Sequence, residues 1–138
     1  MTLTTVLCPL DFSAASAGLV TYAAALAVAA GAELRLLHVQ ETPPALAGSV
    51  AEQLAAHRAV AAQAGARVST VVLPGAAAAA IVAEARRYPA DLIVIGAHGQ
   101  TGLTRFLMGS TAEAVVRTAP CATLLVKPSP VDAYRQSA

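Results

Sequence analysis

Five short apolar runs alternate with longer alanine-rich segments along the chain. The runs lie at residues 4–10, 33–39, 67–73, 91–96 and 122–128, and Val, Ile and Leu dominate them. Three of the runs are almost continuously hydrophobic, which is typical of strands covered on both faces in a parallel sheet. We therefore predict five strands with a helix between each strand and the next.

The first and last of these helices carry the clearest signals. For residues 14–30 we expect Ser13 to be the N-cap. The expected buried stripe of this helix is Leu19, Ala23, Leu26 and Ala30. For the helix at residues 111–119 the spacing i, i+3, i+4, i+7 also predicts a buried face. That face consists of Ala112, Val115, Val116 and Ala119.

Two further helices are expected at residues 51–64 and 76–88, because alanine is a strong helix former. Gly65 is a plausible stop for the first of them. The alternation of strands and helices predicts an α/β fold with right-handed crossovers and a doubly wound sheet. Residues 1–128 are expected to form one domain, and residues 129–138, with Pro130 and small polar residues, a flexible C-terminal tail.

Composition narrows the classes of partner. Of the 138 residues 57% are hydrophobic and 12% are charged, and the formal net charge is +1. Because there is no basic field to attract a phosphate backbone, no nucleic-acid partner is expected. Cys8 and Cys121 stand in apolar runs, where a free cysteine acts as a small hydrophobe, so we expect neither a disulfide nor a metal pair.

One segment resembles a membrane span by its length alone. Residues 12–32 carry no charge, but the segment is mainly alanine with few large aliphatic side chains, which insert most strongly into bilayers. The first residues also lack the positive region of a signal peptide. We therefore expect no membrane association and a cytoplasmic location.

The fourth strand runs into a glycine-rich loop that could hold phosphate. Glycines recur there at Gly96, Gly99, Gly102 and Gly109. Backbone amides without a neighbouring Cβ can approach an anion, and the helix that follows adds its positive dipole end. Within this loop Arg105 offers a guanidinium for phosphate oxygens, and hydroxyl donors follow in the next helix.

A structural explanation of the same loop remains open. Gly96 and Gly109 could be turn residues, and Ser110 with Glu113 matches a capping box. Other phosphate motifs are absent from the sequence. There is no G-x-x-x-x-G-K-[ST], and no G-x-G-x-x-G follows the first strand, which disfavours a P-loop NTPase and a Rossmann dinucleotide site.

These residues resemble the universal stress protein family, of the ATP-binding type. Its signature G-x2-G-x9-G-[ST] is matched by Gly96, Gly99, Gly109 and Ser110, and the similarity extends from "VLCPLDFS" to "CATLLVKP". The resemblance implies a three-layer α/β/α fold like that of the adenine nucleotide alpha hydrolases. It also implies a five-stranded parallel sheet in the order 3-2-1-4-5.

The resemblance further implies a bound nucleotide, ATP, possibly with Mg²⁺. Asp11 matches an acidic residue at the ribose, and Val39 matches a position that lines the adenine pocket. Their alternative roles are a turn residue and an ordinary core residue. Together with the phosphate argument, the candidate binding residues are Pro9, Asp11, Val39, Gly96, His98, Gly99, Arg105, Gly109, Ser110 and Thr111.

Two departures from the family pattern weaken the expected affinity. Residues 41–64 form a short segment, and Leu10 stands where Thr is frequent. Catalytic and metal residues are not recognised. We expect a nucleotide-dependent stress-response or signalling module. The alternatives are a slow ATPase or phosphotransferase, or a nucleotide-free dimeric scaffold. The apolar last strand, at a sheet edge, is expected to form a homodimer.

Overall fold

The fold was analysed in a computed structural model that describes residues 2–41, 47–97 and 109–127. The predicted tail at 129–138 and most of the glycine-rich loop lie outside these ranges. The five strands are β1 (Thr5–Pro9), β2 (Glu33–Gln40), β3 (Arg67–Pro74), β4 (Leu92–Gly96) and β5 (Ala122–Val126). They form one parallel sheet in the order β3-β2-β1-β4-β5, which confirms the predicted topology.

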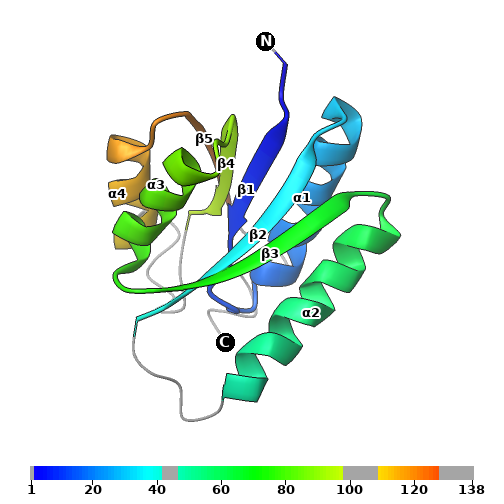
Figure 1. The fold of residues 1–138 in the computed structure, drawn as a ribbon, viewed down its shortest axis with the longest axis horizontal. Coiled ribbons are helices and arrows are strands. Elements are labelled where there is room, and N and C mark those ends of the chain that lie inside the picture. The colour runs from blue at the N-terminus through cyan, green and yellow to red at the C-terminus, as the bar shows by residue number, and fades with distance from the viewer. Residues whose placement is uncertain (1, 42–46, 98–108, 128–138) are drawn as a thin grey trace.

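Helices cover both faces of this sheet. They are α1 (Ser16–Ala30), α2 (Ala47–Gln63), α3 (Ala77–Arg87) and α4 (Ser110–Thr118). The helices α1 and α2 lie on one face, and α3 and α4 lie on the other (Figure 1). The three-layer α/β/α architecture is therefore as predicted. Within the described residues, none of the helices has both the length and the apolar content to cross a bilayer.

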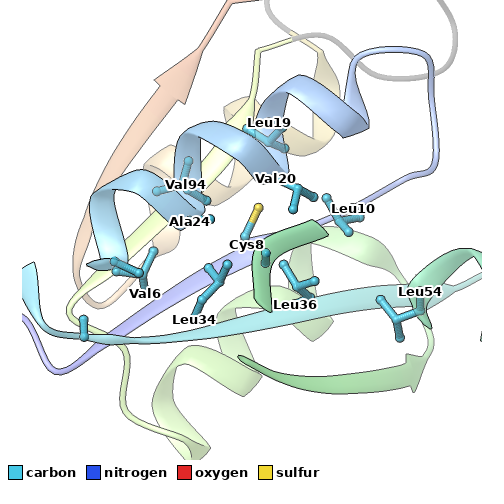
Figure 2. Packing of buried hydrophobic residues seen from close by; sticks show 14 residues of the cluster. Val6, Cys8, Leu10, Leu19, Val20, Ala24, Leu34, Leu36, Leu54 and Val94 are labelled. Atoms are coloured by element: carbon cyan, nitrogen blue, oxygen red, sulfur yellow. The ribbon is translucent and has the colours of Figure 1, made fainter. Parts of the chain in front are cut away.

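The central strand β1 is buried along its whole length and separates two hydrophobic clusters. Val6 and Cys8 point toward the α1 side, whereas Leu7 packs on the α3 and α4 side. Figure 2 shows the sulfur of Cys8 among aliphatic side chains of α1 and β2. Burial raises the pKa of this thiol to about 12, so it stays protonated and acts as a small apolar side chain.

The first helix differs from its prediction in two respects. Its N-cap is Ala15, which makes no side-chain cap bond, so the prediction of Ser13 was wrong. The reason is local: the amide of Ser13 is bound by Asp11, and its carbonyl accepts a bond from the amide of Ser16. At the other end, Ala30 is exposed because the helix ends at Gly31, with φ 70°. The buried α1 residues are Ser16, Leu19, Val20, Ala23, Ala24 and Ala27.

The middle helices agree more closely with expectation. The α2 helix begins four residues before the predicted start, at Ala47, and ends before Gly65, whose φ of 98° confirms it as the stop. The α3 helix lies within its predicted range. In α4, Ala112 and Val115 are buried as predicted, but Val116 is 44% exposed, so only part of the expected stripe faces the sheet.

A buried ion pair, which the sequence patterns did not reveal, ties α3 to the sheet. Arg35 on β2 donates from Nε to Glu84 Oε2 at 2.9 Å, and the side chain of Glu84 is only 1% exposed. Arg87 also donates to Glu84, at 2.8 Å, and Arg35 donates to the hydroxyl of Ser69. The guanidinium of Arg35 lies 4.1 Å from the centre of the Tyr88 ring. These bonds compensate the burial of both charges.

Candidate functional site

The candidate site lies where the carboxyl ends of β1 and β4 meet. The two strands are neighbours, with Val6 opposite Leu92 and Leu7 opposite Ile93. Continuing this register brings the turn after β1 to the same edge of the sheet as Gly96. In a doubly wound sheet this edge is the usual place for a ligand, because the chain leaves the neighbouring strands in opposite directions.

The start of α4 is attached directly to the end of β4. The amide of Gly109 donates to the carbonyl of Ala97 at 2.7 Å, and the amide of Ala97 donates to Val126 at 3.0 Å. The first turn of α4 is therefore held at the carboxyl edge of the sheet, next to the ends of β4 and β5. Ser110 is exposed there and Thr111 is half-buried.

Among the residues that the structure describes, no side chain caps this helix. Gly109 is the N-cap, with φ −63° and ψ 152°, and it makes no side-chain cap bond. The predicted capping box was wrong, since Ser110 is already helical and Glu113 binds Arg117 at 2.8 Å. The first amides of a helix need acceptors from elsewhere, and together with the helix dipole they favour an anion.

Asp11 forms a turn after β1. Its Oδ1 accepts a hydrogen bond from the amide of Ser13 at 2.9 Å, and the hydroxyl of Ser16 lies 3.4 Å away. The turn role that the sequence left open is therefore present.

The other described candidates line the same edge of the sheet. Pro9 ends β1 and is buried, whereas Gly96 ends β4 and is half-buried. Val39, near the end of β2, is half-buried and packs against the hydrophobic cluster on the α3 and α4 side. These are the contacts expected if Val39 is an ordinary core residue. Its remaining exposed surface leaves it available to a ligand.

Three predicted residues, His98, Gly99 and Arg105, lie outside the described residues. Among the residues that are described, no group of three or more His, Cys, Asp and Glu side chains could hold a metal ion. Cys8 and Cys121 are both free cysteines.

The structure brings three rings together beside Asp11, a contact that the sequence analysis did not predict. The ring of Phe12 stacks on His38, with centroids 4.2 Å apart, and on His57, with centroids 6.0 Å apart. We call these residues the three-ring stack. His57 on α2 is half-buried, and burial lowers its pKa. The rings come from three separate elements, so no periodicity could indicate their contact.

A model of the universal stress protein family matches residues 2–127. The chain therefore belongs to the universal stress protein family, as the sequence resemblance indicated.

Similar proteins agree with this assignment. A universal stress protein of Methanocaldococcus jannaschii is 48% identical over 63 residues, or 46% of this chain and 37% of that protein. Universal stress protein A homolog 2 of Coxiella burnetii is 31% identical over 110 residues, which cover 78% of this chain and 66% of the relative. These matches span less than two thirds of either relative.

Solved structures share the fold over most of the chain. The structure of a universal stress protein in complex with cAMP aligns with a TM-score of 0.79 and 28% identity, over 94% of this chain and 100% of that chain. A universal stress protein from Archaeoglobus fulgidus in complex with dAMP has a TM-score of 0.74 and 22% identity, with 92% and 100% coverage. At that identity the second likeness concerns the fold alone.

Proposed function

We propose that this chain is an ATP-binding universal stress protein, a nucleotide-dependent module of stress response or signalling. The observation that carries the proposal is the start of α4, where the described residues supply no side-chain cap. Gly109 places it against the end of β4, with a 2.7 Å bond to Ala97. This arrangement suits the phosphates of a nucleotide. The cAMP complex of a relative with 28% identity supports an adenine nucleotide as the ligand class.

The nucleotide would extend along the carboxyl edge of the sheet. Phosphates would contact the amides near Gly96 and Gly109 and the hydroxyls of Ser110 and Thr111. We assign the remaining phosphate contacts to His98, Gly99 and Arg105, which lie outside the described residues. Asp11 would accept hydrogen bonds from ribose hydroxyls, and Pro9 and Val39 would line the adenine side. Mg²⁺ would reach the site with the phosphates.

Calorimetric titration with ATP in the presence of Mg²⁺ tests this proposal. Saturable heat without phosphate release is expected for a signalling module. Phosphate release above the buffer rate would instead support a slow ATPase or phosphotransferase. The absence of binding at millimolar ATP would refute nucleotide binding and favour the dimeric scaffold.

Gly109→Val tests the phosphate assignment. The φ of −63° at Gly109 is accessible to any L residue, so this substitution adds bulk without demanding a rare backbone conformation. A Cβ at a closely approached amide should weaken ATP binding at least about tenfold, or about 1.4 kcal/mol.

Ala55→Val, on the exposed surface of α2, is the matched control and should leave affinity unchanged. Circular dichroism and thermal melting would verify that both variants fold. A folded Gly109→Val protein with full ATP affinity would refute the assignment.

We also propose a homodimer formed through β5. This strand is an edge of the sheet, and Leu125 on it is 37% exposed. Edge strands offer unpaired backbone groups, and pairing with a symmetric copy would satisfy them. Size-exclusion chromatography with light scattering should give twice the chain mass at micromolar concentration, and a monomer there would contradict the proposal.

A further inference from the structure

Phe12 has an unusual backbone conformation for a large side chain. Its φ is 61°, and it is the only residue other than glycine with a positive φ in the described part of the chain. Side chains with a Cβ rarely adopt this conformation, and it is found most often where neighbouring contacts impose it. The contacts around Phe12 therefore need an explanation.

Those contacts come from β2 and α2. The Phe12 ring stacks on His38 with an angle of 22° between the planes, and on His57 with an angle of 5°. Nδ1 of His38 also lies 2.8 Å from the carbonyl oxygen of Leu10. Since a carbonyl only accepts hydrogen bonds, the proton of His38 lies on Nδ1. The His38 ring therefore contacts the turn at two points: it donates to the backbone carbonyl of Leu10, and it stacks on the ring of Phe12.

Asp11 lies between these two points of attachment. On one side, the amide of Leu10 donates to Leu37 at 2.7 Å, and the carbonyl of Leu10 accepts from His38. On the other side, Phe12 is held by its two ring contacts. The bond from the Ser13 amide then fixes Oδ1 of Asp11. The carboxylate is thus oriented before any ligand arrives, which lowers the entropy lost on binding.

We infer that Phe12 is a positioning residue for nucleoside recognition: the three-ring stack holds the Asp11 carboxylate where it meets the ribose hydroxyls of an adenine nucleotide. This inference rests on the proposed function. It adds a link from the ribose to α2, because His57 belongs to that helix. Nucleotide binding should therefore change the environment of the His57 ring, although His57 is not among the proposed nucleotide contacts.

Phe12→Leu tests the inference. Leucine keeps an apolar side chain in the cluster and removes the ring. Affinities for ATP and for 2′,3′-dideoxy-ATP, which lacks both ribose hydroxyls, should be measured in parallel. Wild type should prefer ATP, and the variant should lose about fivefold in ATP affinity with little change for the dideoxy analogue. In an Asp11→Ala background, Phe12→Leu should have no further effect, since the two residues act as one unit.

The matched control is Tyr22→Leu, which removes an aromatic ring that is 47% exposed on α1. It should leave the preference for ATP unchanged. Should Phe12→Leu fail to fold, His57→Gln removes the outer ring of the stack and should reduce the same preference by a smaller factor. Ring resonances of His57 in wild type should also shift on addition of ATP, and less on addition of the dideoxy analogue.

The outcomes separate this inference from the proposed function. If wild type binds neither nucleotide, the proposed function itself fails. If wild type prefers ATP and the folded Phe12→Leu protein keeps that preference, only the positioning role is refuted. Equal weakening of both nucleotides would show a general structural role and would also overturn the inference.

Discussion

The two ends of the parallel strands differ in how their polar groups are used. At the amino end, Oδ2 of Asp91 accepts bonds from the amide and hydroxyl of Thr4 and from the amide of Thr5, at 2.7, 2.7 and 3.1 Å. Nearby, the hydroxyl of Tyr88 donates to Glu33 at 2.8 Å. Each of these charged groups is matched by a group of the same chain.

The carboxyl end has a different character. Within residues 2–41, 47–97 and 109–127, no side chain caps the first turn of α4. Phe12 holds a backbone conformation that its residue type disfavours. The start of α3 does receive a local carboxylate at this edge, where Glu41 accepts from the amide of Ala77 at 3.1 Å. The contrast suggests that the amino end stabilises the fold, and that the carboxyl end keeps donors and a fixed turn for a ligand.

The largest expected effect is at the amino end. Glu84→Ala would leave Arg35 buried without its partner, and breaking a buried pair in this way costs about 3–5 kcal/mol. Denaturant unfolding should show this loss, and ATP affinity of the folded fraction should be unchanged. Replacing both charges, as in Arg35→Met with Glu84→Leu, should recover much of the stability. A loss below about 1 kcal/mol in the single variant would show that the pair is effectively solvated.

The next effect is at the carboxyl end. Asp11→Ala should weaken ATP binding by about 1–3 kcal/mol, because one or two hydrogen bonds to the ribose are lost. Affinity for 2′,3′-dideoxy-ATP should change far less. An unchanged dissociation constant for ATP would leave Asp11 with its turn role only.

Acid should affect the two ends in separate ranges. The lowered pKa of His57 means that the unfolded chain binds its proton first, so the contribution of His57 is intact above about pH 6.5 and falls as the pH drops below that value. The hydrogen bonds from Thr4 lower the pKa of Asp91, so its contribution persists above about pH 3.9 and is lost as the pH falls through the folded value.

Unfolding measured from pH 7 to 3 checks both ranges. His57→Gln should flatten the shallow slope below pH 6.5, and Asp91→Asn should flatten the part below pH 4. The test lies in the order of the two pH ranges: the His57 contribution should be lost at higher pH than the Asp91 contribution. If Asp91→Asn flattened the upper range instead, the assignment of the ends would be reversed.

The smallest effect is expected at the exposed pair in α4. Arg117 and Glu113 are 2.8 Å apart with side chains 73% and 49% exposed. Glu113→Gln should cost about 0.3–0.5 kcal/mol, which is the usual value for an exposed helical pair. Since Glu113 does not cap the helix, this variant should leave ATP affinity unchanged. A large loss of affinity would instead indicate that the predicted capping box forms when nucleotide is bound.

Most of the fold could be predicted from sequence because its signals are local. The central residues of β1 and β4 are buried on both faces and are therefore apolar, and alanine-rich segments between the strands form helices. The helix starts were less predictable. Ser13 and Ser110 are residue types that often cap helices. Ser13 instead belongs to a turn before α1, in which its amide donates to Asp11, and Ser110 is already the first residue of α4.

The sequence by itself determined the order of elements, the sheet's hydrophobic centre and the glycine pattern that marks the family. Each of these depends on residue type and spacing along one segment. The tertiary structure decided which groups from distant segments meet: Arg35 with Glu84, and Phe12 with His38 and His57. Such contacts depend on the position of a helix against a strand, and that position is set by packing of the whole core.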